Sequence, residues 1–257
     1  MSLNRPRTLL FDIETSLQPV AVFQLANNDW INPDNILSER HLISVCWKWL
    51  GEPTIHSVSL LDDPARFNRD PHDDFYVAKV FHGILSEADV VVGHNSNSFD
   101  LKYLKTRMLV HGFPVLPPIA SLDTYLVLKK HFMLNSNKLD YAAKLLKVGK
   151  KMDTPKGLWL DVLRGDRKAI KTMTAYNRVD VDILEKVFKK LQPYMDNHTN
   201  RELFGGTGCP RCGSTKFQSR GVHRAITRVY QRFCCNKCGG WFRKLKSETG
   251  STQFRIL

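Results

Sequence analysis

The sequence predicts an α/β domain with a mixed sheet, followed by a small β module that carries paired cysteines. Short apolar segments come first and segments with helical periodicity dominate afterwards, an order that favours a sheet flanked by helices. The 257 residues exceed the usual size of one domain. Residues 201–257 contain five of the six cysteines and most of the net charge, so they form a second part of the chain.

The first part of the chain begins with segments typical of strands. Residues 7–13 form an apolar run, and segments 41–50 and 54–61 follow, separated by Gly51 and Pro53. We therefore expect one strand followed by a hairpin. A further short strand is expected within 88–95.

Helical spacing of apolar residues begins at residues 75–88. A second helix is expected after Ser98, which we place at its N-cap, and Gly112 ends it. From Ser121 onward the sequence predicts mostly helix, in segments 122–133, 138–148 and 167–191. The basic segment 147–157 between them is predicted to be a surface loop.

Composition and charge narrow the possible functions. Hydrophobic residues make up 42% and charged residues 25% of the chain, which excludes a disordered protein. No apolar run approaches the length of a membrane helix, and the N-terminus lacks the apolar core of a secretory signal, so we expect a cytoplasmic protein without membrane contact. Residues 201–257 contain 12 Lys and Arg against two Glu, so they carry +10 of the net +13. A basic module on a nearly neutral body indicates nucleic acid as the partner, although a solubilising tail is the alternative.

Acidic residues follow the predicted strands and lie on the last helix. In a strand, Asp12 and Glu14 share a face about 6 to 7 Å apart. Asp100 lies in the first turn of a predicted helix, where the helix dipole favours negative charge. Tyr176 precedes Asp180 by four residues, so the two share a helical face, whereas Asp182 points away.

The motifs FDIE, GHNSNSFD and YNRVD stand in this order along the chain. Together they resemble the DEDD exonucleases of the ribonuclease H-like superfamily, in the tyrosine subclass, and most closely the stand-alone bacterial and phage type. The resemblance covers residues 7–191 and implies a ribonuclease H-like mixed sheet flanked by helices in residues 1–195. It also implies a 3′–5′ exonuclease that hydrolyses DNA, with single-stranded or frayed ends favoured. A phage-encoded protein acting in a host cytoplasm is compatible with it.

The resemblance implies a catalytic set of Asp12, Glu14, Asp100, Tyr176 and Asp180. The four carboxylates would bind two Mg²⁺ or Mn²⁺ ions, hard cations that take oxygen ligands and clamp a phosphodiester in pairs. Tyr176 would orient the attacking water. We further expect His94, Asn95 and Lys150 to contact substrate, and Lys151 beside Lys150 is a second candidate for a phosphate contact. The alternatives are a turn for His94 and Asn95 and solvated side chains for the two lysines. Asp123 is expected to cap a helix rather than to bind metal.

Two CxxC pairs lie in the basic part of the chain, and 22 residues separate them. The spacing predicts a four-cysteine zinc ribbon over residues 207–257, joined by a linker at 196–206. Two disulfides are the alternative. The zinc ligands would be Cys209, Cys212, Cys235 and Cys238, since the neighbouring Cys234 has no CxxC partner.

Basic and aromatic residues alternate between the two CxxC pairs, which is typical of a surface that binds nucleic acid. Predicted contacts are Arg220, Arg224, Arg228 and Tyr230. Because a module this small needs its own core, Tyr230 and Trp241 are also expected to be structural. The ribbon is alternatively a docking site for a replication or repair protein.

Three other functions remain open from the sequence. The same chemistry serves RNA exonucleases and structure-specific endonucleases, because a pair of metal ions does not fix the sugar or the position of the cut. A non-catalytic nucleic-acid-binding accessory protein is the third.

Overall fold

The computed structural model describes residues 6–22, 31–196, 208–225 and 228–245. The chain divides into an N-terminal unit, Arg7–Leu191, and a C-terminal unit that begins at Gln192. The linker predicted at 196–206 lies, apart from Asp196, outside the described residues. Within the described segments, no helix has both the length and the apolar character needed to cross a bilayer.

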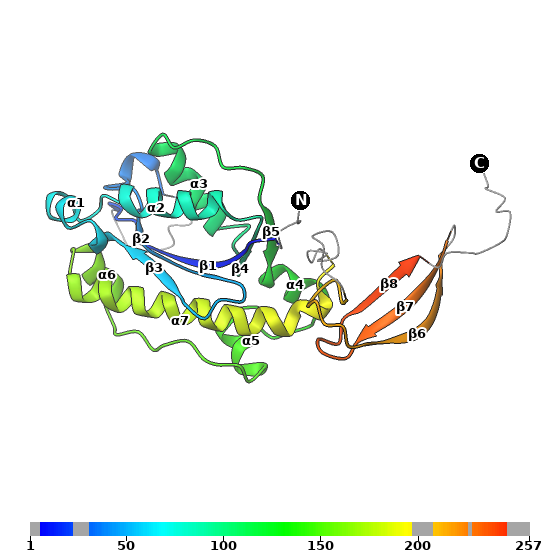
Figure 1. Cartoon of the computed structure of the whole chain (residues 1–257). Coiled ribbons are helices and arrows are strands. Elements are labelled where there is room, and N and C mark those ends of the chain that lie inside the picture. Colours follow the sequence, from blue (N-terminus) through cyan, green and yellow to red (C-terminus); the bar gives the residue numbers. More distant parts are fainter. Residues whose placement is uncertain (1–5, 23–30, 197–207, 226–227, 246–257) are drawn as a thin grey trace. The chain divides into compact units, whose positions relative to one another are not determined.

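A five-stranded mixed sheet forms the centre of the N-terminal unit (Figure 1). Its strands are β1 (Thr8–Thr15), β2 (Leu42–Trp49), β3 (His56–Ser59), β4 (Val90–Gly93) and β5 (Ala120–Asp123). They lie in the order β3-β2-β1-β4-β5, and β1 is antiparallel to β2 but parallel to β4. The predicted mixed sheet and the hairpin after the first strand are therefore confirmed.

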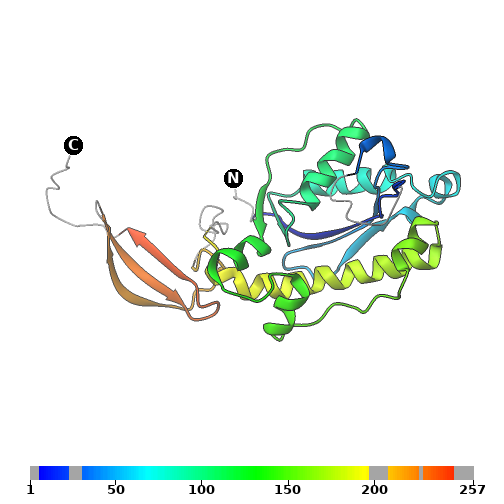
Figure 2. The ribbon, with the colours of Figure 1, turned by 180° about the vertical axis from the view of Figure 1, so that it is seen from behind.

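Helices cover both faces of this sheet, as Figures 1 and 2 show from opposite sides. One face carries α1 (Pro64–Arg69), α2 (Phe75–Ser86) and α3 (Asp100–Val110), and the other carries α5 (Leu139–Leu145), α6 (Leu158–Leu163) and α7 (Arg167–Leu191). The helix α4 (Thr124–His131) follows β5 and packs against α7. Burial on both faces explains why β1 and β4 contain the apolar runs LLF and VVV.

Successive side chains of β1 point to opposite faces of the sheet. The Phe11 ring contacts Phe81 of α2, with ring centroids 5.5 Å apart. Asp12 and Glu14 therefore point to the opposite face, which α7 covers. Because β1 is hydrogen-bonded to β2 on one side and to β4 on the other, this central strand is a rigid support for its two carboxylates.

Several predicted boundaries differ from the structure. The strand predicted to reach residue 61 ends at Ser59, because the Ser59 side chain and Asp62 form a capping box that starts the short 3-10 helix η2 (Leu60–Asp62). Ser98 is not an N-cap: α3 begins at Asp100, and its N-cap residue Phe99 makes no side-chain hydrogen bond. The short elements β5, α1 and α6 were not predicted, and two further 3-10 turns, η1 and η3, occupy Pro33–Asn35 and Gln192–Tyr194. The predicted helix at 167–191 matches α7 at both ends.

A buried ion pair joins the sheet to α7. Lys48 Nζ of β2 lies 2.6 Å from a carboxylate oxygen of Glu185, and their side chains are only 10% and 7% exposed. Replacing Glu185 with alanine is expected to lower the free energy of unfolding by about 3 kcal/mol or more, because the Lys48 ammonium would stay buried without its partner. The measurement is urea denaturation.

The pair Lys186–Asp182 on the same helix, at 2.6 Å, supplies the control, because its side chains are 48% and 41% exposed. Asp182→Ala is expected to cost less than about 1 kcal/mol, since solvent screens such a pair. Equal losses in the two variants would contradict the argument from burial.

The C-terminal unit contains a three-stranded antiparallel sheet in the order β6-β7-β8. The strands are β6 (Phe217–Arg224), β7 (Val229–Cys235) and β8 (Trp241–Leu245). Phe217, Phe233 and Phe242 contact one another, with ring centroids 5.3 to 5.4 Å apart. These rings are the packed aromatic cluster of the sheet. The expectation that Trp241 is structural was wrong, because its side chain is 53% exposed.

Candidate active site and cysteine cluster

Three acidic side chains meet where β1 passes α7. Carboxylate oxygens of Asp12, Glu14 and Asp180 all lie within 4.8 Å of one another. Asp180 is 1% exposed, and its Oδ1 atom is buried and accepts no hydrogen bond from the residues that the structure describes. An oxygen so placed lacks the partner that buried polar atoms normally have, which suits a metal ligand.

Asp100 lies beside this acidic cluster at the first turn of α3 and is 6% exposed. Its carboxylate accepts hydrogen bonds from the backbone N–H groups of Ile13 and of Asp100 itself. Its charge also raises the pKa of Asp12. The structure thus brings together the four acidic residues that the sequence predicted, from the three elements β1, α3 and α7.

Burial and mutual repulsion disfavour the charged forms of these carboxyl groups. Removal from water, followed by the charges of Asp100, Glu14 and Asp180, raises the pKa of Asp12 well above its usual range. Burial and the Asp180 charge raise the pKa of Glu14 to about 8, and burial raises the pKa of Asp100 to about 6. Such a site favours cations, and its oxygen ligands fit Mg²⁺ or Mn²⁺.

Asn177 also belongs to this site. The side chain is fully buried, and its Nδ2 atom donates a hydrogen bond of 2.7 Å to Asp12 Oδ2, which fixes the orientation of that carboxylate. The sequence could have pointed to Asn177, because this residue directly follows Tyr176 and belongs to the motif YNRVD.

Lys151 is a second residue of this site, and its contacts with the acidic cluster were not predicted. Its Nζ atom donates hydrogen bonds to Asp180 Oδ2 at 2.5 Å and to the Tyr176 hydroxyl at 2.9 Å. Burial disfavours the ammonium, but the Asp180 carboxylate outweighs it and raises the pKa of Lys151. The backbone N–H of Lys151 donates to Asp140 Oδ1 at 2.9 Å, which holds the loop in place. The sequence selected the neighbouring Lys150, which the structure places in solvent.

A cleft of about 390 Å³ adjoins the acidic cluster. It is lined by Asp12, His94, Asn95, Tyr125, Lys138, Leu139, Asp140 and Lys151. A ligand bound in this cleft would contact carboxylates, cationic side chains and an aromatic ring.

His94 and Asn95 line this cleft, and His94 is also held by the protein. Its Nδ1 atom lies 2.9 Å from Thr124 Oγ1 and its Nε2 atom 2.9 Å from the Asn137 carbonyl oxygen. Burial lowers the pKa of His94, which favours the neutral ring. The Asn95 backbone, at a positive φ of 63°, donates its N–H to Asp123 Oδ1 at 2.8 Å. Asp123 caps α4, as expected, by accepting the Tyr125 N–H.

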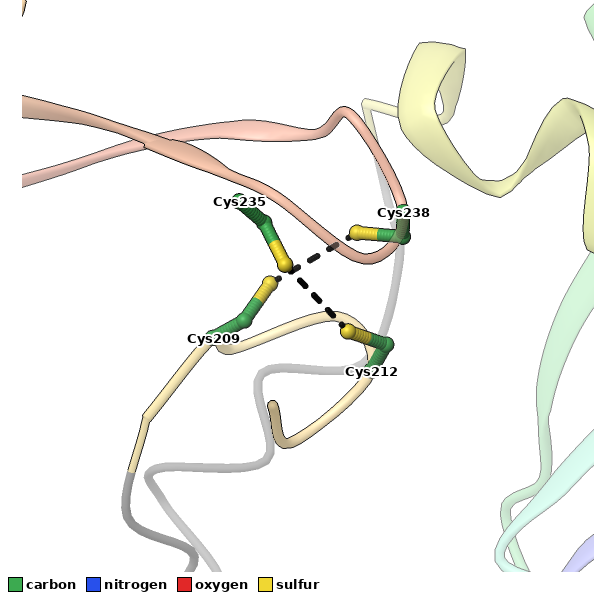
Figure 3. Close-up of side chains that lie close together, drawn as sticks. All are labelled: Cys209, Cys212, Cys235 and Cys238. Carbon is green, nitrogen blue, oxygen red and sulfur yellow. Dashed lines mark hydrogen bonds between the residues drawn. The ribbon is translucent and has the colours of Figure 1, made fainter. Parts of the chain in front are cut away.

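The four cysteines of the two CxxC pairs lie together in the C-terminal unit (Figure 3). Their sulfur atoms are all within 4.8 Å of one another, with 3.8 Å between Cys209 and Cys238 and 3.6 Å between Cys212 and Cys235. Four sulfurs at the usual Zn–S bond length in a tetrahedron are separated by about 3.8 Å. All four thiols are free, so the disulfide alternative is not what the structure shows. Cys234 lies outside the cluster.

The Cys235 thiol ionises more easily than an ordinary cysteine thiol. Burial opposes its ionisation, but backbone N–H groups of Cys238 and Lys237 lower its pKa to about 7. Burial raises the pKa of Cys212 and Cys238. Because thiolates are the form that binds zinc, the backbone of this turn prepares one ligand for the metal.

The predicted nucleic-acid contacts of the C-terminal unit differ in their surroundings. Arg220, Arg224 and Arg228 are exposed. Tyr230 is half-buried, and the Arg243 guanidinium lies 4.4 Å from the centre of its ring.

The raised carboxyl pKa values lead to a prediction about stability. The carboxyl of Glu14 has an ordinary pKa of 4.5, and in the folded protein this rises to about 8. Between these values the folded state holds a proton that the unfolded state has lost, so stability falls as the pH rises. In buffer passed over a chelating resin, Glu14→Gln is therefore expected to be more stable than the native protein by about 1 to 3 kcal/mol at pH 8.

Thermal unfolding at several pH values checks this prediction. The two proteins are expected to converge as the pH falls below 4.5, where the unfolded state of the native chain also becomes protonated at this position. Added Mg²⁺ is expected to stabilise the native protein at pH 8 more than the variant. A native protein whose stability stays constant between pH 5 and pH 8 would contradict the electrostatic account.

Comparison with known proteins agrees with the fold. A search of curated proteins found no match. The family model of the RNase H superfamily matches residues 58–192, which are 135 of the 257 residues and include Asp100, Tyr176 and Asp180.

Among solved structures, the family B DNA polymerase of the hyperthermophilic archaeon Pyrobaculum calidifontis is similar, with a TM-score of 0.56 and 21% identity over 80% of this chain. The similar region is only 26% of the polymerase, so this chain spans about a quarter of its length. At this identity the likeness shows the fold. The family match over more than half of its residues shows that the chain belongs to the RNase H superfamily.

Proposed function

We propose that the protein is a metal-dependent 3′–5′ exonuclease that hydrolyses DNA at single-stranded or frayed ends. The observation that carries the proposal is that Asp12, Glu14, Asp100 and Asp180 lie together in an RNase H superfamily fold, beside a cleft that Asp12 lines. The 3′–5′ direction and the choice of DNA rest on the resemblance of the three acidic motifs to the DEDD exonucleases.

The four carboxylates would hold two Mg²⁺ or Mn²⁺ ions. Bound there, such ions would activate a water molecule and stabilise the leaving oxygen of the phosphodiester. Asn177 keeps Asp12 oriented through its hydrogen bond of 2.7 Å. The backbone N–H of Ile13 holds Asp100 against β1. These contacts preorganise the oxygen ligands on rigid elements.

Tyr176 would orient the attacking water. Burial raises the pKa of Tyr176, so the phenol keeps its proton and acts as a hydrogen-bond donor rather than as a base. Its hydroxyl accepts a hydrogen bond from Lys151 at 2.9 Å and also bonds the Asp180 carboxylate, so the phenol is held beside a proposed metal ligand, where it could turn its proton to a water molecule or a substrate oxygen.

End-labelled oligonucleotides test this proposal. With Mg²⁺ or Mn²⁺, a 5′-labelled DNA strand is expected to give a ladder that shortens one nucleotide at a time, and a 3′-labelled strand is expected to release labelled mononucleotide at once. A ladder from the 3′-labelled strand would show that hydrolysis proceeds from the 5′ end, contrary to the proposal. Discrete internal fragments would indicate an endonuclease. A matched RNA strand tests the preference for the sugar.

Lys151 is expected to affect metal binding and turnover in opposite ways. Its ammonium bonds the same Asp180 carboxylate that is proposed to bind a cation, so Lys151→Met is expected to lower the Mg²⁺ concentration for half-maximal activity several-fold. The maximal rate is expected to fall, since Tyr176 loses the partner that orients it. Lys150→Met, at the exposed neighbouring position, is the control and is expected to change neither value. Unchanged Mg²⁺ dependence in Lys151→Met would show that the ammonium does not compete with the metal.

The cysteine cluster is proposed to hold one structural Zn²⁺. The sulfur distances and the four free thiols support this assignment. Nine Lys and Arg and not one acidic residue occur in residues 208–245, so this module remains cationic even if four thiolates around zinc contribute about −2.

A further inference from the structure

The two faces of the C-terminal sheet have different chemistry. In an antiparallel sheet, directly paired residues share a face and successive residues alternate between faces. Pairing of Phe233 with Phe242 defines a phenylalanine face, which also carries Phe217. Pairing of Arg232 with Arg243 defines the opposite face. We call it the tryptophan face, and its residues are His223, Tyr230, Arg232, Trp241 and Arg243.

The three rings of the phenylalanine face contact one another, and only Phe217 among them is exposed, by 38%. The tryptophan face instead leaves its largest ring in solvent, with Trp241 53% exposed. Trp241 and Phe242 are neighbours in β8 and lie on opposite faces, so the sheet keeps one aromatic residue for packing and presents the next to solvent.

Arginines alternate with aromatic rings on the tryptophan face. The Arg232 guanidinium lies 5.9 Å from the centre of the Trp241 ring, and the Arg243 guanidinium lies 4.4 Å from that of Tyr230. The His223 ring lies 6.2 Å from Tyr230. Tyr230 is thus covered on this face and holds Arg243 in place, whereas Trp241 remains accessible.

An open hollow of about 300 Å³ lies on this surface. It is lined by His223, Arg232, Trp241, Phe242 and Arg243. The hollow therefore combines one accessible aromatic ring with two guanidinium groups.

We propose that the tryptophan face binds single-stranded nucleic acid, with a base stacked on Trp241 and phosphates contacted by Arg232 and Arg243. Residues 208–245 contain no Asp or Glu, so their charge selects a polyanion. An exposed ring between guanidiniums is the arrangement that binds unpaired bases, because stacking needs a free base face and the cations follow the backbone. A duplex keeps its bases stacked on each other and offers only its phosphates to this surface.

This inference rests on the proposed function, since it assigns the strand that the proposed nuclease would hold. It also changes the set of contacts expected from the sequence. Tyr230 supports Arg243 instead of stacking on a base, and Trp241 takes the stacking role.

Fluorescence anisotropy of a labelled oligothymidylate, titrated with the full-length chain, tests the proposal. All proteins carry Asp12→Asn to prevent hydrolysis of the oligonucleotide. No chelator is then needed to stop the reaction, so the zinc site stays intact. Binding is measured directly, so the result does not depend on whether the protein proves to be a nuclease. Trp241→Ala is expected to weaken binding about 5- to 100-fold, the range measured for loss of one stacked base. Trp241→Phe is expected to restore most of the affinity, and both variants are expected to bind blunt duplex DNA as tightly as the parent.

Two adjacent residues of β8 provide a charge-matched comparison. Arg243 lies on the tryptophan face, whereas Lys244 pairs with Gln231 on the phenylalanine face. Arg243→Ala is expected to reduce the dependence of log affinity on log salt by about 0.7, the value for one phosphate contact on a single strand. Lys244→Ala is expected to reduce it less.

Tryptophan emission gives a reading that does not depend on the folding of an alanine variant. The chain has five tryptophans, and oligothymidylate is expected to quench part of their emission in the parent but not in Trp241→Phe. Equal quenching in the two proteins, or an unchanged affinity of Trp241→Ala for the single strand, would overturn the proposal. Equal losses of single-strand and duplex binding would also overturn it and reduce the surface to a phosphate contact.

Discussion

Replacing Asp12 with asparagine is expected to lower the rate of DNA hydrolysis by about 10²- to 10³-fold or more, the cost of losing one well-placed electrostatic group. Asp12 belongs to the acidic cluster, together with Glu14 on its own strand and Asp180 on α7. The amide keeps the size of the carboxylate but removes its charge. The rates of nucleotide release from a 5′-labelled strand at saturating Mg²⁺ measure the effect.

The same substitution is expected to stabilise the metal-free protein. Burial and three neighbouring carboxylates raise the pKa of Asp12, so its charge opposes folding at neutral pH. A residue that only supported the fold would lose stability on substitution. Lower activity together with a higher melting temperature in metal-free buffer is therefore the signature of a functional carboxylate.

Asp182→Asn provides the matched control for this experiment. Asp182 lies two residues beyond Asp180 on α7, but its side chain is 41% exposed and paired with Lys186. Its substitution is expected to leave hydrolysis unchanged. Native rates in Asp12→Asn would show that the acidic cluster is not the active site and would remove the basis of the proposed function.

Sequence spacing related the acidic residues in pairs because they lie on regular structure. Alternation along β1 puts Asp12 and Glu14 on one face, and the four-residue separation of Tyr176 and Asp180 puts both on one side of α7. The end of β1 and the middle of α7 then meet because α7 packs across β1 and β2. Periodic signals therefore gave the fold class and these two pairs, whereas the gathering of all four carboxylates, Asp100 included, was an expectation from the resemblance of the motifs.

Lys151 shows what periodic signals do not contain. Lys150 and Lys151 lie in an irregular loop, where no repeat tells which side chain points inward. The choice depends on a hydrogen bond from the Lys151 backbone to Asp140, which lies 11 residues earlier in α5. Such tertiary contacts of loops are set by packing, so the sequence predicted a basic loop but gave no signal for the contact between Lys151 and Asp180.

The aromatic residues of the C-terminal sheet show a related limit. Alternation separates Trp241 from Phe242, but it does not say which of the two faces is packed. The structure answers this through the contacts among Phe217, Phe233 and Phe242. With only a small core to fill, three phenylalanines suffice, and the tryptophan remains exposed.

Cys235→Ser is expected to abolish zinc binding and to unfold the C-terminal unit. Cys235 is 1% exposed, its thiol has a pKa of about 7, and its sulfur lies 3.6 Å from that of Cys212. A sheet of three short strands with one aromatic cluster buries too little apolar surface to fold alone, so its stability depends on the metal. Metal content is expected to fall from one zinc per chain to nearly none, and limited proteolysis is expected to remove the C-terminal unit from an intact N-terminal unit.

Cys234→Ser is the control, because it also removes a thiol from β7 but leaves the four clustered cysteines in place. Cys234 is the adjacent residue, but it lies outside the sulfur cluster and its Sγ contacts only the Gly239 carbonyl oxygen, at 3.7 Å, among the hydrogen bonds described. This variant is expected to keep its zinc and its resistance to protease. Because the N-terminal unit carries the acidic cluster, Cys235→Ser is expected to keep metal-dependent hydrolysis of short strands while binding long single strands more weakly and with a shallower salt dependence. Full zinc content in Cys235→Ser would contradict the four-sulfur site, and unchanged affinity for long strands after loss of zinc would separate the cysteine cluster from nucleic-acid binding.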